Sequence, residues 1–592
     1  MNKQLLLALV LLLLLVACLP AADSPDQFEP LQDKQRSALT HDDLMAASYP
    51  GDEPVDNAYL APTAAALPAE HTLEGSLTIP EFEMAYQAHD GDLPRSSHAY
   101  FPEVTVDFFT YKDHLAPAVR GIVRGEGETS YWNVIFSPGR IWSEAGDEGL
   151  SRASFPFLLV GDDYGEAHNG LATFLFDDQE VSSLYLQITQ ETAPWHHTDF
   201  WGQAPIEYEP RPLKCHENLV EAFAGEVEKQ NPIRPWSELV TGRDVEVMDA
   251  FGSTSEPVDV SASGIVKDGA IYLRGCDTRY GPFPYCGHMR HGVFSVTKSM
   301  AASVAMLRLA QKYGPQIFDL KLADYVDIQA DHDGWDDVTF GDALNMATGV
   351  GDHQPRPVEP NPIHGNEDQQ KFSNFMRVGS AESKLAVAFD YGNYPWGPGE
   401  IARYSSVNTF LLSAAMDAFL KEQEGPKADI WDMVVEEVYQ PIGLQHAPIM
   451  RTIEPDGGKG VPIFGYGLYP TVDDVAKITT LLQNGGRHEG QQLLHPGKLA
   501  EALYQTETIG FPAGQRNAAG ELRYNASYWG LPYGSQDGDA FLVPYMMGFG
   551  GNLVVLNPNG LTAFRFSDAH NYDVASKVRT AAGIEPFPTL TE

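Results

Sequence analysis

One apolar stretch constrains the fold more than any other part of this chain. Residues 295–313 read SVTKSMAASVAMLRLAQKY, with good helix formers and neither proline nor glycine, and Gly314 and Pro315 follow as a stop signal. The sequence therefore predicts a helix over this stretch. Because apolar or small residues occupy nearly every face of it, we expect the helix to be buried inside a larger domain.

Ser295 and Lys298 lie three residues apart at the amino end of this predicted helix and so share one face of it. A serine hydroxyl becomes a nucleophile when a nearby base takes its proton. Lysine can be that base where burial lowers its pKa from about 10.4. Free N–H groups at a helix start also favour developing negative charge. The alternative is that Ser-x-x-Lys occurs here by chance, so the rest of the chain has to decide.

The length of 592 residues exceeds what one hydrophobic core supports and predicts two or three domains. The net charge of −42 repels nucleic acid and anionic lipid head groups, so we expect no nucleic-acid partner. Acidity by itself identifies no substrate.

The first 18 residues predict export from the cytoplasm. Lys3 precedes a leucine-rich segment, residues 5–16, which is too short to span a bilayer and is typical of a secretory signal. The segment Leu15-Val-Ala-Cys18 resembles a bacterial lipobox, which implies that Cys18 is lipidated and anchors the protein in the envelope. Leu19 after it resembles the sorting signal for the outer membrane, facing the periplasm. The alternative is a plain signal peptide with an incidental cysteine.

Residues 19–75 are rich in Ala, Pro and Asp and predict a flexible acidic tether. Over 76–212 short apolar and aromatic runs recur between turn residues, which predicts a β-sandwich-like domain of unknown role. The predicted strands are 104–111, 131–136, 155–160, 172–176 and 183–189. The remainder, 213–592, mixes helical and strand patterns and ends in a predicted hairpin over 553–566.

Neither the histidines nor the cysteines predict a metal site, and we expect no cofactor. His196 and His197 are adjacent, and neighbours on a strand point to opposite faces, so we expect structural or surface roles for both. Cys276 and Cys286 flank a turn-rich loop and can close a disulfide in an oxidising compartment, which would leave Cys215 free.

Two further positions in the second half of the chain suggest chemistry. Tyr404 precedes an apolar helical segment, 408–420. A phenolate beside a lysine ammonium can accept a serine proton, whereas the alternative is a core tyrosine at a helix start. The glycine-rich segment 548–551 indicates a close backbone approach, or an N–H that faces an oxyanion.

Together, five segments resemble the serine β-lactamase and penicillin-binding-protein superfamily, in its class C β-lactamase and related esterase branch. The resemblance runs from about 255 to 580 and implies a mixed α+β fold. In that fold a β-lactamase-like domain, with an antiparallel sheet flanked by helices and a helical lobe, follows the β-rich N-terminal domain. The segments are Phe294-Ser-Val-Thr-Lys298, Leu344-Asn-Met-Ala-Thr-Gly349, Pro398-Gly-Glu-Ile-Ala-Arg-Tyr-Ser-Ser406, Gly467-Leu-Tyr-Pro-Thr-Val-Asp-Asp474 and Gly548-Phe-Gly-Gly551.

The resemblance also implies roles for individual residues. Ser295 would attack an acyl carbon to form an acyl-enzyme, and Lys298 would help to deprotonate it. Tyr404 would carry the proton to the leaving group and then activate water. The backbone N–H groups of Ser295 and Phe549, beside Gly548, would form the oxyanion hole.

Two positions depart from the β-lactamase pattern. Met546 stands where the third motif, which ends at Gly548, usually has Lys or His, and this puts recognition of a substrate carboxylate in doubt. Ser406 stands where β-lactamases have asparagine, and a serine there also occurs in relatives that cleave esters or small amides. A β-lactamase would need a cation from elsewhere, such as Arg403 or Arg565.

The sequence therefore predicts an envelope-tethered serine hydrolase that acts on an ester or amide, either a small molecule or a cell-envelope component. Two alternatives stay open. One is a β-lactamase or D-alanyl-D-alanine carboxypeptidase, and the other is a non-catalytic envelope binding protein on the same fold. The presence together of Ser295, Lys298 and Tyr404 favours the hydrolase.

Overall fold

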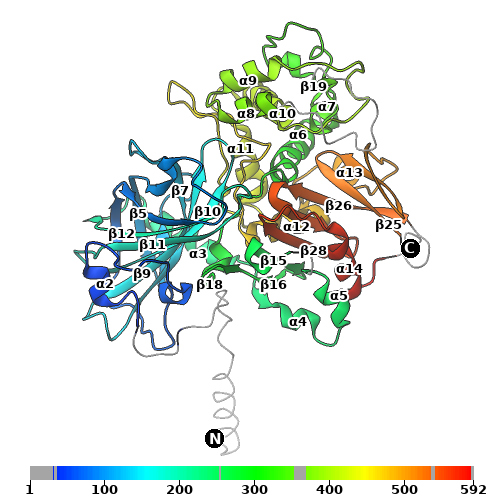
Figure 1. Cartoon of the computed structure of the whole chain (residues 1–592). Helices are drawn as coiled ribbons and strands as arrows, with labels where there is room; N and C mark the ends of the chain where they lie inside the picture. The colour runs from blue at the N-terminus through cyan, green and yellow to red at the C-terminus, as the bar shows by residue number, and fades with distance from the viewer. Residues whose placement is uncertain (1–30, 32–35, 253–254, 352–368, 535–539, 589–592) are drawn as a thin grey trace, which may run out of the picture.

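The computed structural model describes residues 31, 36–252, 255–351, 369–534 and 540–588. The predicted signal segment with Cys18, and the first part of the predicted tether, lie outside these residues. None of the described helices has the length and apolar character needed to cross a bilayer. Over the described residues the fold is mixed α+β, as predicted, with two large sheets that lie side by side (Figure 1).

The first large sheet is antiparallel and runs in the order β13-β1-β5-β6-β8-β9-β10-β11-β12-β3, with β7 paired to β9. The five predicted strands are confirmed as β5, β7, β9, β10 and β11. Its strands are β1 (Glu74–Ile79), β3 (Ala85–Ala88), β5 (Val104–Tyr111), β6 (His114–Pro117), β7 (Trp132–Phe136), β8 (Gly139–Ser143), β9 (Ser151–Gly161), β10 (Ala167–Phe176), β11 (Leu184–Glu191), β12 (Thr198–Ala204) and β13 (Glu207–Pro210).

This arrangement differs from the predicted sandwich of two sheets. The long strand β9 pairs with β10 along one edge, and along the other edge with β8 near its start and β7 near its end. One sheet therefore branches at β9. Strand lengths and apolar patterns are the same in both architectures, so the sequence pattern could not distinguish them.

Residues 36–73 also differ from the flexible tether predicted for 19–75. They include α2 (His41–Met45) and a 3₁₀ turn, Asn57–Leu60, and Leu44 and Leu60 are fully buried against the first sheet. Arg36 makes an ion pair with Glu144, with Nε and Oε2 2.7 Å apart. Few but well-spaced leucines are enough to dock this segment, although its composition resembles that of a linker.

The second large sheet is antiparallel except for β14, which pairs in parallel with β16. The predicted hairpin near the end of the chain is confirmed as β27 and β28. In sheet order the strands are β14 (Ile233–Pro235), β16 (Ala270–Gly275), β15 (Val260–Lys267), β28 (Thr562–Ser567), β27 (Asn552–Leu556), β26 (Ala540–Gly548), β25 (Tyr528–Gly534), β24 (Gly520–Asn525) and β23 (Phe511–Asn517).

Helices cover both faces of this second sheet. On one face α14 (Val574–Ile584) packs in the same apolar cluster as β27. On the other face α6 (Val304–Tyr313), α10 (Ser406–Glu424) and α12 (Val472–Gln483) share a large core with alternate residues of β28. The short helices α7 (Phe340–Leu344), α8 (Gln369–Arg377) and α9 (Ala381–Phe389) lie at the outer end of α6 and α10 (Figure 1). The short helix α11 (Ile430–Val434) packs beside α6.

The predicted helix over 295–313 is present, but its first part is wound differently. A turn at Ser295 leads into a π-helical segment, Lys298–Ser303, which continues as α6 and ends at Gly314, whose φ is 98°. Segments of π-helix are rare and often occur at functional sites. Every residue of this one is buried.

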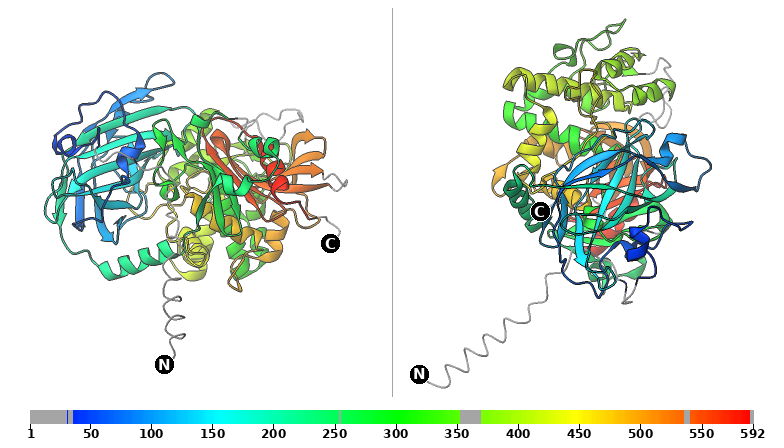
Figure 2. Two further views of the ribbon diagram at one scale, coloured as in Figure 1. Left: turned by 90° about the horizontal axis from the view of Figure 1, so that it is seen from below. Right: turned by 90° about the vertical axis from the view of Figure 1, so that its left-hand side faces the viewer.

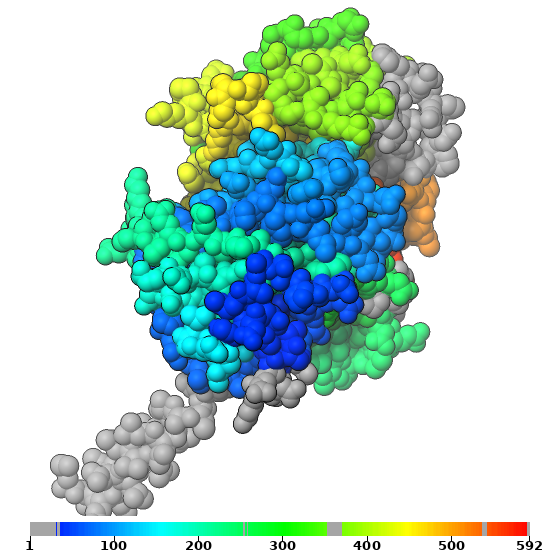
Figure 3. Space-filling model, turned by 60° about the vertical axis from the view of Figure 1, so that its left-hand side comes forward, coloured from blue at the N-terminus to red at the C-terminus, as the bar shows by residue number. Residues whose placement is uncertain are grey.

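The two sheets share an interface rather than a loose linker. Ile135, Leu158 and Val160 of the first sheet belong to the same apolar core as α6 and α10. The hydroxyl of Thr192 accepts a hydrogen bond from the N–H of Gly292 at 3.0 Å, just before the turn that carries Ser295. Figures 2 and 3 show the first sheet, in blue and cyan, lying directly against the helical part of the chain.

Candidate active site

Ser295 sits on a tight turn between a buried loop and the helix. The residue before it, Phe294, has a φ of 46°, in the left-handed region that bulky residues rarely adopt. Backbone hydrogen bonds from Val296 to Val293 and from Thr297 to Phe294, at 3.2 and 2.9 Å, close the turn. The strained turn leaves Ser295 half-buried while its neighbours are buried.

Lys298 lies one turn further on, with 1% of its surface exposed. Its Nζ atom makes three hydrogen bonds, at 2.8 Å to Ser295 Oγ, 2.9 Å to Ser406 Oγ and 2.7 Å to the carbonyl oxygen of Gly465. The predicted pair of Ser295 and Lys298 is thus in direct contact. Ser406 and Gly465 hold the amine against the serine from two other parts of the chain.

Tyr404 and Ser406 reach the site from the start of α10. Ser405 caps this helix through a hydrogen bond from the N–H of Val407, so residues 404–406 lie at its amino end. The ring centroid of Tyr404 is 4.9 Å from Lys298 Nζ, and the ring also packs against Trp529. The site therefore gathers all three predicted catalytic residues.

Gly548 ends β26 beside the turn that carries Ser295. A Cβ atom at Gly548 would lie 2.1 Å from the carbonyl oxygen of Val293, so only glycine fits this close backbone approach. Phe549 follows in a short 3₁₀ turn, Phe549–Gly551, with its side chain 47% exposed. The end of β26 is thus fixed next to Ser295, as the glycine-rich segment predicted.

These residues open into a cavity of about 550 Å³. Its wall is largely aromatic, and none of the described residues that line it carries a charged side chain. Two of its aromatic residues, Tyr164 and Trp195, come from the first sheet. The lining residues are Tyr164, Trp195, Phe294, Ser295, Phe372, Ser373, Met376, Tyr404, Ser406, Tyr466 and Phe549.

Met546, the departure from the third motif, is fully buried in the core and does not line the cavity. Arg403 and Arg565, the two arginines considered as substitute cations, do not line the cavity either. Arg565 is 1% exposed and bonds to the carbonyl oxygen of Gly551, and burial lowers its pKa to about 10. Arg403 packs over the ring of Trp396, and burial lowers its pKa. The hypothesis that these arginines bind a substrate carboxylate therefore has no support.

Cys276 and Cys286 form a disulfide in the loop before the Ser295 turn, and Cys215 is free and exposed. Sequence reasoning missed two groups of cavity residues. Tyr164 and Trp195 lie in loops of the first sheet, and Phe372 and Met376 lie on α8. No local pattern marks them, because they meet Ser295 only through the packing of distant segments.

No family model and no curated protein matches the chain. Solved structures do. EstCE1, a hydrolase with promiscuous acyltransferase activity, is 14% identical with a TM-score of 0.42, and the match covers 59% of this chain and 98% of that one. A penicillin-binding-protein homologue from Caulobacter crescentus is 17% identical, with a TM-score of 0.38 and coverages of 56% and 94%.

A family VIII carboxylesterase is 18% identical, with a TM-score of 0.39 and coverages of 57% and 96%. Class C β-lactamases are also among the neighbours. The structural neighbours are thus members of the β-lactamase and penicillin-binding-protein-like group that the five motifs resemble.

Proposed function

We propose that the protein is a serine hydrolase that forms an acyl-enzyme on Ser295 and acts on an ester or amide with an apolar acyl group. The observation that carries the proposal is the 2.8 Å contact between Ser295 Oγ and the buried Nζ of Lys298, at the floor of an uncharged cavity. A nucleophile and a base within hydrogen-bond distance are what covalent catalysis requires.

In the proposed reaction Lys298 acts as the base in its neutral form. A neutral amine has two N–H donors and one lone pair. The carbonyl oxygen of Gly465 and the hydroxyl of Ser406 can accept the two N–H bonds, which directs the lone pair at Ser295. Ser295 then passes its proton to Lys298 as its oxygen bonds to the acyl carbon.

In the proposed reaction the carbonyl electrons move onto the substrate oxygen, which the backbone N–H groups of Ser295 and Phe549 stabilise. When the carbonyl reforms, the leaving group departs with a proton delivered through Tyr404. Water, deprotonated by the same side chains, then attacks the acyl-enzyme and releases the acid. The closeness of Tyr404 to Lys298 and the fixed position of Gly548 support these two roles.

The composition of the cavity favours an apolar substrate. Rings and one thioether form most of its wall, and burying an apolar acyl chain there gains about 25 cal/mol per Å² removed from water. A β-lactam or a peptide that ends in D-alanine carries a carboxylate, which needs a cation. This difference makes an ester or a small amide the proposed substrate.

The test uses the mature protein and its Ser295→Ala variant, each treated with a fluorophosphonate and weighed intact. We expect one adduct on the parent and none on the variant. Hydrolysis of p-nitrophenyl butyrate should fall by about 10³-fold or more in Ser295→Ala. No adduct and no turnover in the parent would favour the alternative of a non-catalytic binding protein.

The alternative of a β-lactamase can be tested separately, because one cation lies just behind the cavity wall. Arg377 Nε donates a hydrogen bond of 2.8 Å to the hydroxyl of Tyr164. If the cavity accepts a carboxylate, nitrocefin should be hydrolysed and Arg377→Ala should abolish that activity alone. We expect no nitrocefin hydrolysis by either protein.

We also propose that the protein is tethered to the bacterial envelope through lipidated Cys18, in the outer membrane facing the periplasm. The lipobox-like segment before Cys18 supports this location. In a bacterial host, the parent should fractionate with membranes and Cys18→Ser should be released into the soluble envelope fraction. Release of both proteins would contradict the anchor.

A further inference from the structure

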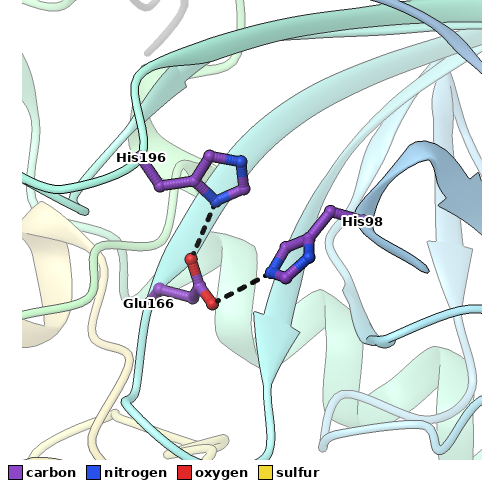
Figure 4. Close-up of side chains that lie close together, drawn as sticks. All are labelled: His98, Glu166 and His196. Atoms are coloured by element: carbon purple, nitrogen blue, oxygen red, sulfur yellow. Dashed lines mark hydrogen bonds and ion pairs between the residues drawn. The ribbon is translucent and has the colours of Figure 1, made fainter. Parts of the chain in front are cut away.

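A buried cluster of histidines surrounds one carboxylate inside the first sheet. Glu166 immediately precedes β10, His98 lies in a 3₁₀ turn, Ser96–Ala99, and His196 lies in the loop between β11 and β12. The side chains of all three are at most 3% exposed. Figure 4 shows the two imidazoles pointing at the two oxygens of Glu166 from separate segments.

The distances within this cluster match those around a bound metal ion. His196 Nδ1 is 3.0 Å from Glu166 Oε2, and His98 Nε2 is 3.6 Å from Oε1. One ligand atom from each of the three residues lies within 4.8 Å of the others. Two ligands of a tetrahedral zinc ion, with bonds of about 2.0–2.1 Å, are roughly 3.3 Å apart.

The hydrogen bonding of His98 directs its other ring nitrogen at Glu166. Its Nδ1 is 3.1 Å from the carbonyl oxygen of Arg95, which can only accept, so Nδ1 carries a proton and Nε2 is the nitrogen that faces the carboxylate. A carbonyl that orients the far nitrogen in this way is the usual support of a ligating histidine.

A third buried histidine adjoins the same carboxylate. His168 Nε2 is 3.4 Å from Glu166 Oε2, and the ring is fully buried. Neither His168 Nδ1 nor His196 Nε2 has a hydrogen-bond partner among the described residues. Three imidazole rings therefore surround one buried carboxylate.

We propose that His98, Glu166 and His196 bind a divalent transition-metal ion, with His168 beside them. Imidazole nitrogens and a carboxylate oxygen are donors suited to Zn²⁺ and its first-row neighbours. The ion joins three segments that are distant in sequence, so its role is structural. Two of these segments also carry Tyr164 and Trp195, so the ion fixes the loops that form one wall of the cavity.

No local sequence pattern indicated this site. His196 and His197 are adjacent, but the structure turns them in different directions. His196 faces Glu166, whereas His197 Nε2 lies 3.3 Å from Asp568 in a second group with Glu191. That second group also holds Arg279, whose guanidinium pairs with Glu191 at 2.6 Å and already supplies a cation.

The test loads the chelator-treated mature protein with Zn²⁺, removes unbound metal by gel filtration and measures the metal by mass spectrometry. We expect about one ion per chain in the parent, and a loss of at least tenfold in retained zinc in Glu166→Gln and His196→Ala. The matched control is His197→Ala, which should retain the ion. Loss in His197→Ala with retention in His196→Ala would overturn the proposal.

A second measurement needs no variant and so does not depend on folding of the mutants. X-ray absorption of the zinc-loaded parent should show two imidazole ligands with bonds of about 2.0–2.1 Å. A shell of oxygen atoms alone, or a parent that retains no zinc, would show that the histidines only hydrogen-bond to Glu166. None of these readouts depends on Ser295, so the metal site and the proposed hydrolase can fail separately.

Discussion

The indole ring of Trp195 lies with its centroid 5.9 Å from the ring of Phe549. Trp195 belongs to a loop of the first sheet, whereas Phe549 follows β26 of the second. Phe294, the residue before the nucleophile, is 5.9 Å from Trp195 and 5.8 Å from Phe549. The first sheet therefore contributes a wall to the cavity and is more than a neighbouring domain.

Replacing Trp195 with alanine should weaken the binding of long acyl chains. Loss of the indole removes an aromatic surface worth about 1–2 kcal/mol, which corresponds to roughly a tenfold rise in KM. Lys298 and Ser295 are untouched, so kcat should change by less than about twofold. The measurement is KM and kcat for p-nitrophenyl octanoate, a long acyl chain, and for p-nitrophenyl acetate, a short one.

The control for this prediction is Tyr86→Ala, which removes an exposed aromatic ring from β3 of the same sheet. This variant should hydrolyse the acetate and the octanoate esters with the same kcat and KM as the parent. An equal loss on acetate and octanoate in Trp195→Ala would mean that the indole supports the fold of the site and not the acyl chain.

Lys298→Met should lower kcat by about 10² to 10⁴-fold, because the variant fills the same space without a base for Ser295. Lys298→Arg is the informative partner. Arginine keeps the positive charge but cannot be neutral in a protein, so it should be as inactive as methionine. Substantial activity in Lys298→Arg would show that the site needs a cation rather than a base. The measurement is kcat for p-nitrophenyl butyrate hydrolysis by the parent and by both Lys298 variants.

Local patterns predicted much of the second half of the chain. Thr339 and Thr471 each begin a Thr-x-x-Asp segment, the spacing of a capping box, and each caps its helix in reciprocal bonds with Asp342 or Asp474. The spacing of Ser295 and Lys298 predicted their contact, because a helical turn brings such residues together whatever surrounds them. Capping, spacing and turn chemistry act over a few residues, so they can be recognised without the fold.

Contacts between distant segments could not be predicted in this way. Gly465 bonds to Lys298 through its carbonyl oxygen, which any residue possesses. Trp195 reaches the cavity, and His98 reaches Glu166, only through the packing of segments that are far apart in the sequence. Each of these depends on packing over long sequence separations, for which one sequence carries no local signal.

Gly548→Ala should impair both stability and catalysis. The added methyl group would lie 2.1 Å from the carbonyl oxygen of Val293, so the end of β26 and the Ser295 turn must move apart. Such overpacking costs about 1–3 kcal/mol, and a displaced N–H of Phe549 should reduce kcat by about 10²-fold. The control is Gly534→Ala on β25, where the nearest atom is 3.8 Å away. Normal kcat in Gly548→Ala would contradict a role for this strand end in catalysis.

His291, four residues before the nucleophile, should make the protein acid-sensitive. It is fully buried against Phe566, and burial lowers its pKa to about 3. In the unfolded chain the His291 imidazole takes up a proton near pH 6.5, whereas in the folded protein it stays neutral to a much lower pH. The folded state therefore loses stability as pH falls below about 6.5. Between pH 7 and pH 5 this group should lower the free energy of unfolding by about 2 kcal/mol. The free energy of unfolding, measured with urea at several pH values, should lose this part of its pH dependence in His291→Gln. The control His71→Gln, at the surface, should keep it. If the free energy of unfolding varies with pH in both variants as in the parent, His291 is not the source.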